Sequence, residues 1–346
     1  MDTEVVRVDP KNPDAGAIGR AAAIIQSGGL VALPTETVYG LGADATNPAA
    51  VERIFEAKGR PATNPTIVHV ADREAAKACA AAWSMEADAL AAEFWPGPVT
   101  IVVPAAAGIA PKALAGGTTV GLRVPGHAVA LALLQAVGRP IAAPSANRSE
   151  GLSPTTAEHV LRTLEGRIDL VLDAGPTSGG LESTVVDLSA RPPKLLRPGL
   201  IAAERLRTLV KELEVGVSID ATETMSAREA VALEKSPGMM ARHYAPATAL
   251  ELCGDMARRL EELAGLRIGV VGIGEELTVA AGGRVVFRRL AGDAVGAARE
   301  LYAVLHELDT MGLDLILIAA PPMSDDWSAI RDRLQRAATP SIQRKP

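Results

Sequence analysis

The sequence predicts an α/β protein in two parts: a large twisted mixed sheet with flanking helices, followed by a small Rossmann-like domain with a parallel sheet. Three observations support this prediction. The chain has 346 residues, more than one domain of about 150 residues would need. Apolar β-rich runs alternate with Ala-rich amphipathic runs, as in α/β folds. After about Leu209 a charged segment interrupts this alternation, which then resumes near Ala249.

The first part contains apolar runs of strand length, separated in most cases by amphipathic helical runs. Helices are expected, for example, over residues 49–57 and 128–137. Because the strands differ in length and in connection, one large sheet fits better than a regular doubly wound one. The predicted strands cover residues 29–35, 66–70, 99–104, 119–125, 140–144, 168–175 and 183–189.

The second part alternates between strand and helix runs, which predicts a small parallel sheet. Strands are expected over 249–253, 267–274, 284–290 and 313–322, and helices over 255–265, 293–310 and 326–337. The run "GVVGIGEEL" supplies Gly272 and Gly274, but Leu277 stands where a dinucleotide fingerprint needs its third glycine, so this motif is weak. The predicted domains are therefore 1–209 and 248–346, joined by a linker over 210–247.

Composition limits the possible functions. The net charge is −6, from 35 basic and 41 acidic residues, without a Lys/Arg tract, which argues against a protein that holds nucleic acid through its phosphates. Cys79 and Cys253 form no CxxC pair, so neither a disulfide framework nor a zinc site is indicated. No run approaches the roughly 18 apolar residues of a membrane span. We expect a soluble, cytoplasmic protein with no membrane association.

Four loops of the first part carry polar side chains. "PTETVYGLG" (residues 34–42) holds three hydroxyl groups and two glycines directly after an apolar strand, and it is also compatible with a simple hairpin. "EAKGRP" places Lys58 and Arg60 at a helix C-terminus, where cations complement the helix dipole. "APSANRSEGLSP" (143–154) offers hydroxyl and amide groups suited to phosphates and purine edges. "DAGPTSGGLESTVVD" (173–187) is a glycine-rich loop that leads into a strand whose first residues are Ser183 and Thr184.

Two arginines lie in apolar strands, Arg123 in "GLRVP" and Arg197 in "LLRPG". A buried arginine needs an anionic partner. One such arginine can pair with an internal Asp or Glu. Two of them, together with Lys58, Arg60 and the hydroxyl-bearing loops, favour an anionic ligand.

These motifs, in this order, resemble the YrdC-like family of threonylcarbamoyl-AMP synthases. The resemblance rests on "PTETVYGLG", the K-x-R of Lys58 and Arg60, "FWPGPVT", "GLRVP", the S-x-N of Ser145 and Asn147, "STVVD" and "RPG". "SPGMMARHYAP" followed by a small α/β domain resembles the long two-domain form. The resemblance implies an enzyme, a nucleotidyltransferase that joins L-threonine, bicarbonate and ATP into threonylcarbamoyl-AMP and releases pyrophosphate.

The resemblance also implies the site residues. Lys58, Arg60, Ser145 and Asn147 would be catalytic. Threonine would be held by Thr35, His69, Arg123, Ala143 and Ser183, with Arg123 on its carboxylate. ATP would be bound by Lys58, Arg60, Asn64, Thr119, Ser145, Asn147, Ser153, Arg197 and Tyr244. The linker residues Arg242, His243 and Tyr244 would form a lid over the site, or the linker would be docked for stability alone.

Cofactors and partners follow from the same resemblance. Mg²⁺ would arrive with ATP, with no dedicated metal site and no organic cofactor. A downstream tRNA threonylcarbamoyl transferase complex would use the product to modify tRNAs that read ANN codons, and we expect no stable nucleic-acid binding by this chain. Two alternatives stay open. A carbamoyltransferase of related fold would need further metal-bearing domains, and a non-catalytic RNA-binding or ribosome-assembly module would need a broad basic face.

Overall fold

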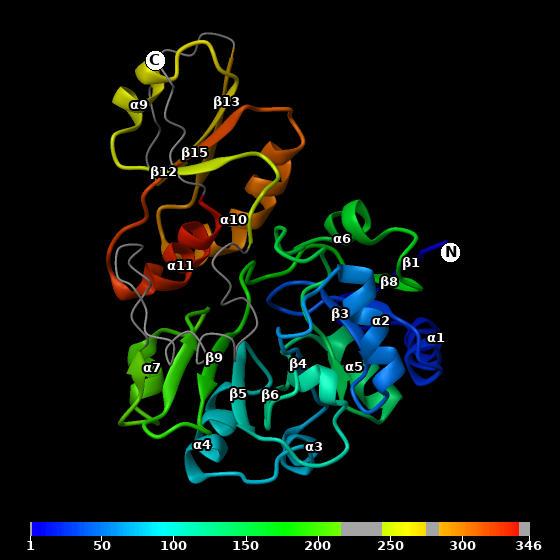
Figure 1. Ribbon diagram of the computed structural model, residues 1–346. Coiled ribbons are helices and arrows are strands. Elements are labelled where there is room, and N and C mark those ends of the chain that lie inside the picture. The colour runs from blue at the N-terminus through cyan, green and yellow to red at the C-terminus, as the bar shows by residue number, and fades with distance from the viewer. Residues whose placement is uncertain (1, 216–243, 275–283, 339–346) are drawn as a thin grey trace. The chain divides into compact units, whose positions relative to one another are not determined.

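The computed structural model describes residues 2–215, 244–274 and 284–338. These residues form two compact units, each an α/β layer structure (Figure 1). The first unit comprises residues 2–149 and 153–215, and the second comprises 150–152, 244–274 and 284–338. None of the described helices combines the length and the apolar character that a membrane crossing requires.

The first unit is built on one mixed sheet of eleven strands, which confirms the predicted fold class. The order across the sheet is β1-β8-β2-β3-β7-β4-β6-β5-β9-β10-β11. The strands are β1 (Glu4–Arg7), β2 (Val31–Leu33), β3 (Gly40–Asp44), β4 (Ile67–His69), β5 (Val99–Pro104), β6 (Thr119–Arg123), β7 (Ile141–Ala142), β8 (Leu170–Asp173), β9 (Thr184–Asp187), β10 (Lys194–Arg197) and β11 (Glu214–Val215).

Helices flank this sheet (Figure 1). Local sequence signals set their ends. The Asp14 side chain caps the N-terminus of α1 by accepting a hydrogen bond from Ala17 N at 2.8 Å. Gly59 and Gly138, in the left-handed conformation, end α2 and α5. The helices are α1 (Ala15–Gln26), α2 (Pro48–Lys58), α3 (Arg73–Ala78), α4 (Met85–Phe94), η1 (Pro111–Leu114), α5 (Ala128–Val137), α6 (Ala157–Leu164) and α7 (Ala203–Arg207).

Successive side chains along each strand point to opposite faces of the sheet. On one face, Val68, Leu122 and Ile101 of β4, β6 and β5 join the core that includes α2, α4 and α6. On the other face, α1 and α5 pack over β2, β7 and β8. The neighbouring strands β4, β6, β5 and β9 contribute nothing to that second core. Among the described residues, α1 and α5 therefore do not pack over this face of the four strands.

The second unit has a four-stranded parallel sheet in the order β12-β15-β13-β14, which confirms the predicted small parallel sheet. Its core includes Met256, Val270 and Leu317. Gly272 lies in β13, while Leu277 of the weak glycine motif lies outside the described residues. The elements are β12 (Leu250–Cys253), α9 (Met256–Glu262), β13 (Ile268–Ile273), β14 (Val285–Leu290), α10 (Ala294–Asp309), β15 (Leu315–Ala319), η2 (Asp325–Trp327) and α11 (Ser328–Ala337).

Candidate active site

Polar residues gather on one face of β4, β6, β5 and β9. It is the same face of the sheet that α1 and α5 cover over β2, β7 and β8. His69 of β4 pairs in register with Arg123 of β6. Since paired residues share a face, the imidazole and the guanidinium project from the same side of the sheet. Thr100 of β5 pairs with Val185 of β9. The sheet therefore brings together residues from four strands that are far apart in the sequence.

A cavity of about 320 Å³ lies over the same four strands. Gly121 of β6 forms part of its floor, and a Cβ at this position would come within 3.1 Å of Thr100 Cγ2. Because Gly121 has no side chain, the space above it remains part of the cavity. Loops on either side supply several threonines, so the cavity is lined by hydroxyl groups as well as methyl groups. The lining residues are Thr63, Pro65, Thr66, Ile67, Thr100, Val102, Leu114, Ala115, Gly117, Thr118, Thr119, Gly121 and Val185.

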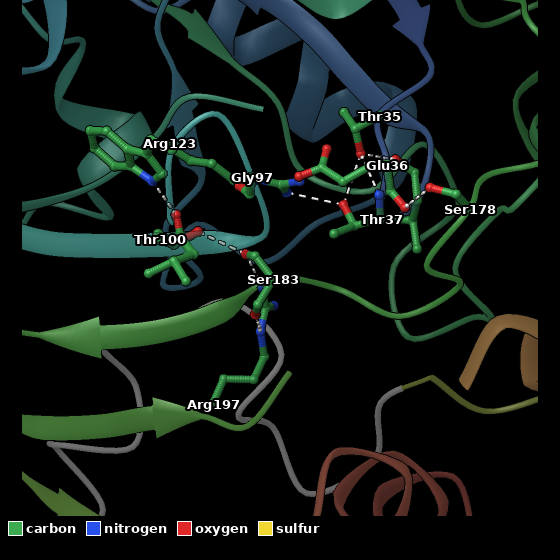
Figure 2. Close-up of polar contacts among 12 residues, drawn as sticks. Thr35, Glu36, Thr37, Gly97, Thr100, Arg123, Ser178, Ser183 and Arg197 are labelled. Atoms are coloured by element: carbon green, nitrogen blue, oxygen red, sulfur yellow. Dashed lines mark hydrogen bonds and ion pairs between the residues drawn. The ribbon is translucent and has the colours of Figure 1, made fainter. Parts of the chain in front are cut away.

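Arg123 is held by three neighbours (Figure 2). Its Nε donates to Gly97 O at 3.1 Å, and its Nη1 donates to Thr37 Oγ1 at 3.0 Å. Its Nη2 lies 2.7 Å from Glu36 Oε1, with the Arg123 side chain 4% and the Glu36 side chain 14% exposed. A buried arginine can pair with an internal acid or with the anion of a ligand. In this structure Arg123 pairs with an internal acid, Glu36.

The surroundings of Arg123 hold unsatisfied polar atoms. Among the described residues, eight buried side-chain N or O atoms have no hydrogen-bond partner, and five belong to Glu36 (two), His69 (two) and Arg123 (one). The Arg123–Glu36 contact is close but not aligned as a hydrogen bond, so it counts as an ion pair only. Buried polar groups without partners are rare in proteins. Their clustering here indicates a place where a polar ligand supplies the missing partners.

His69 is neutral in this environment. Its side chain is buried, and burial, reinforced by the Arg123 cation, lowers the pKa of His69 well below its ordinary value of 6.5. A neutral imidazole has one ring nitrogen that donates and one that accepts. His69 can therefore exchange hydrogen bonds with a ligand hydroxyl without adding a charge to the site.

Thr35 belongs to the loop between β2 and β3, next to Arg123. Its hydroxyl donates to Val38 O at 2.7 Å and lies 2.8 Å from Thr37 Oγ1, which in turn accepts from Arg123. The loop of the β2–β3 hairpin thus fixes two hydroxyl groups beside the guanidinium. The hairpin interpretation of "PTETVYGLG" is confirmed, and a ligand-binding role for its hydroxyl groups stays a prediction.

Ser183 lies beside Arg197 and Thr100 (Figure 2). The Arg197 guanidinium donates to Ser183 O at 3.0 Å and to Ser183 Oγ at 3.1 Å. The Ser183 hydroxyl is 2.7 Å from Thr100 Oγ1. Ser183, the residue before β9, thus connects Arg197 of β10 to Thr100 of β5, which lines the cavity.

Lys58 holds the loop that contains Ser145 and Asn147. Its ammonium donates to Ser145 O at 2.5 Å, to Asn147 O, and to Asn147 Oδ1 at 3.4 Å. Ser145 Oγ also donates to Asn147 Oδ1 at 2.6 Å. Burial, with a smaller contribution from the Arg60 cation, lowers the pKa of Lys58 well below 10.5. The structure thus joins the K-x-R and S-x-N motifs directly through Lys58.

Arg60 fixes the loop on the other side of α2. Its Nε donates to Asn64 O at 3.0 Å, and its Nη2 donates to Asn64 Oδ1 and Pro65 O, each at 2.7 Å. Pro65 lines the cavity. Arg60 and Asn64 therefore lie together at the edge of that cavity, while Thr119 is part of its wall.

The remaining predicted residues fall in different places. Ser153 donates to Glu182, the residue before Ser183, and Ala143 N donates to Ile67 O at 2.9 Å next to the cavity floor. Tyr244 lies in the second unit, where it is buried between Tyr302, at 6.2 Å between ring centroids, and the Arg333 guanidinium. Arg242 and His243 of the predicted lid lie outside the described residues.

Three polar residues of this site were missed by the sequence interpretation. Glu36 stands between the two threonines of "PTET", and the prediction uses only the hydroxyl groups of that loop. Thr100 is the one polar residue in "VTIVVP", and Glu182 precedes Ser183. A polar side chain inside an apolar strand was the available signal for Thr100. Among residues 2–215, 244–274 and 284–338, no three His, Cys, Asp or Glu side chains are grouped to hold a metal ion.

Fold and site together define a two-unit α/β protein with a candidate ligand site where His69, Arg123 and Thr100 share one sheet face. The sequence profile of the Sua5/YciO/YrdC family, described as "Telomere recombination", matches residues 23–199. A second profile, "Threonylcarbamoyl-AMP synthase, C-terminal domain", matches residues 201–339. The chain belongs to the two-domain Sua5 family of threonylcarbamoyl-AMP synthases.

Relatives match both parts of the chain. A threonylcarbamoyl-AMP synthase of Pyrococcus abyssi is 41% identical over 92% of this chain and 93% of its own length. One of Bacillus subtilis is 40% identical over 93% of this chain and 92% of its own. The crystal structure of P. abyssi Sua5 complexed with L-threonine superposes with a TM-score of 0.86 at 38% identity, covering 97% of this chain and 98% of that one.

Proposed function

We propose that this chain synthesises threonylcarbamoyl-AMP from L-threonine, bicarbonate and ATP, releasing pyrophosphate. The observation that carries the proposal is the cluster of five unpartnered buried atoms on Glu36, His69 and Arg123. It lies on the sheet face that also bears a cavity of about 320 Å³. The relatives named threonylcarbamoyl-AMP synthase, at 40–41% identity over more than nine tenths of the chain, support it.

The amino acid would bind at this cluster. Arg123 would receive the carboxylate, because a guanidinium fork matches a carboxylate better than any other cation. Neutral His69 and the Thr35 hydroxyl would hold the substrate's own hydroxyl group, with Ala143 and Ser183 completing the site. The P. abyssi structure with L-threonine supports an amino-acid site in this fold.

ATP would bind in the adjoining cavity, which has a volume of about 320 Å³. Asn64 and Thr119 lie at its edge and wall, where they can meet the nucleotide. The phosphates would be held by Lys58, Arg60, Ser145, Asn147, Ser153 and Arg197. These groups are preorganised by the hydrogen bonds that tie Lys58 to the S-x-N loop and Arg60 to Asn64.

The chemistry needs positioning and charge neutralisation. The amine of threonine and bicarbonate give a carbamate and water. A carbamate oxygen then bonds to the α-phosphorus of ATP while the bond from that phosphorus to the bridging oxygen breaks, and pyrophosphate leaves. Both reactants are anionic, so the cations Lys58, Arg60, Arg123 and Arg197 offset their repulsion. Catalysis of such transfers rests largely on orientation and electrostatics, without a protein nucleophile.

Mg²⁺ would enter as part of the MgATP substrate, since this ion keeps most of its ligands on phosphates and water. The labile product would pass to a transferase complex that modifies tRNAs reading ANN codons. Holding the tRNA would be the task of that complex, in keeping with the net charge of −6.

The test is pyrophosphate release from MgATP with L-threonine and bicarbonate supplied together or omitted one at a time. The proposal predicts release only when both are present, and its loss in Arg123→Ala. Arg7→Ala is the matched control, because the Arg7 side chain is 92% exposed and its removal should leave the rate unchanged. Release that is independent of threonine would refute the proposal.

A further inference from the structure

Glu36 occupies a fixed place beside Arg123. Its backbone carbonyl accepts from Gly179 N at 2.7 Å and from Ser178 Oγ at 3.4 Å (Figure 2). The loop that carries it is further tied by the contact between the Thr35 and Thr37 hydroxyls. The backbone of Glu36 is therefore held in place, and its carboxylate reaches Arg123 from this fixed backbone.

The Glu36 carboxylate lacks the donors that a buried anion needs. Neither Oε atom accepts a hydrogen bond from a described residue, although Oε1 lies 2.7 Å from Arg123 Nη2. Removing a carboxylate from water without hydrogen bonds is strongly unfavourable. A ligand that donates hydrogen bonds and carries positive charge would offset this penalty.

An α-amino acid brings such a donor to this spot. Its ammonium and carboxylate are attached to one carbon, so they are separated by about the same short distance as Glu36 Oε1 and Arg123 Nη2. With the carboxylate on Arg123, the ammonium comes to lie beside Glu36. The Arg123 guanidinium, the substrate carboxylate, the substrate ammonium and the Glu36 carboxylate then form a ring in which the charges alternate in sign. Each charge has two neighbours of opposite sign.

We propose that Glu36 binds the amino group of the amino-acid substrate and selects for it, so that Arg123 and Glu36 form a zwitterion site. This inference rests on the proposed function, because it takes Arg123 as the carboxylate partner. It adds a specificity-determining residue from the loop between β2 and β3. It also explains why an arginine meant for a substrate carboxylate has an acid next to it: the acid serves the other end of the same substrate.

The experiment compares L-threonine with 2,3-dihydroxybutanoate of the same configuration, in which a hydroxyl replaces the amino group. Affinities are measured by calorimetry for the full chain and for Glu36→Gln, Glu36→Asp and Asp44→Asn. Asp44 is the matched control, a buried carboxylate of β3 that pairs with Arg139 at 2.8 Å. Binding of a non-hydrolysable ATP analogue checks that each variant is folded.

The wild-type chain should prefer L-threonine to the hydroxy acid by about 10- to 100-fold, the usual effect of a hydrogen bond to a charged group. Glu36→Gln should abolish this preference, Glu36→Asp should keep part of it, and Asp44→Asn should keep all of it. The ratio of two affinities within one variant does not depend on how much of the protein is folded.

Two results would overturn the inference while leaving the proposed function intact. The first is an unchanged preference in Glu36→Gln. The second is tighter L-threonine binding by Glu36→Gln, which would mean that Glu36 competes with the substrate carboxylate for Arg123. If the wild-type chain binds no L-threonine at all, the proposed function fails, and the inference fails with it.

Discussion

Lys58 donates a hydrogen bond from its ammonium to the backbone carbonyl of Ser145 at 2.5 Å. The two residues are 87 positions apart in the sequence, one at the C-terminal end of α2 and the other in the loop after β7. With its further contacts to Asn147, Lys58 supplies three donors to three oxygens. The K-x-R motif and the S-x-N motif of the family are thus joined by hydrogen bonds.

Replacing Lys58 by methionine should release the Ser145–Asn147 loop. The three oxygens would lose their common donor, while the apolar stem of the side chain would still fill its space. We expect faster hydrogen exchange in a peptide covering residues 143–149 and at least tenfold weaker binding of an ATP analogue, with exchange in β9 unchanged. The matched control is Lys11→Met, because Lys11 is exposed. Unchanged exchange in 143–149 would contradict this role.

Gly59 ends α2 in the left-handed conformation, with φ 61°, between Lys58 and Arg60. An alanine here would be strained, and its Cβ would lie 3.3 Å from Arg148 Nη2. Gly59→Ala should lower the free energy of unfolding by about 1–2 kcal/mol, measured by urea denaturation. Gly19→Ala, in α1 with no atom within 4 Å of the new Cβ, should instead raise it by roughly 0.5–1 kcal/mol. Equal effects would contradict the assignment of strain to Gly59.

Filling the cavity floor should block the nucleotide. In Gly121→Val the Cβ would meet Thr100 Cγ2 at 3.1 Å, and its methyl groups would occupy part of the cavity. We expect binding of an ATP analogue to weaken by more than tenfold, as measured by calorimetry, with the circular dichroism spectrum preserved. Gly254→Val, at an exposed glycine with nothing within 4 Å, should bind as the wild type does. Normal binding by Gly121→Val would place the nucleotide elsewhere.

His69 should make the stability of the first unit depend on pH. Its pKa is lowered in the folded state by burial and by Arg123, whereas the unfolded chain takes up a proton near pH 6.5. Below pH 6.5 the unfolded state therefore binds more protons, and the free energy of unfolding falls as pH falls. The slope from one such group reaches at most about 1.4 kcal/mol per pH unit. Stability that is fully present above pH 6.5 is lost on acidification.

The variant His69→Gln removes this titration. Urea denaturation at pH 7, 6 and 5 should show the wild type losing more stability than His69→Gln as pH decreases. Parallel loss in the two proteins would mean that the histidine is protonated equally in both states.

Local sequence signals predicted much of the fold. The strand over 99–104 and the helix over 128–137 have the predicted bounds, since a short run of β-branched apolar residues marks the first and Gly138 ends the second. In contrast, β1 (Glu4–Arg7) was not predicted. Three of its four residues are exposed, so no alternation marks it, and it forms by pairing with β8.

The site was predicted less completely, for a physical reason. Lys58, Arg60 and Arg123 are charged residues next to apolar runs, and such contrast is visible in one sequence. The role of Glu36 depends on an ion pair across 87 positions, which arises only when the β2–β3 hairpin and β6 lie in one sheet. The lid interpretation concerns residues outside those described, and Tyr244 is buried within the second unit.

The most direct test of the central claim is to follow a labelled carbon. The chain is incubated with MgATP, L-threonine and ¹³C-bicarbonate, and the products are analysed at once by mass spectrometry. The account predicts an adduct of threonine and AMP that carries one labelled carbon, formed in equal amount to pyrophosphate. Pyrophosphate without a labelled adduct, or an adduct without the label, would contradict it.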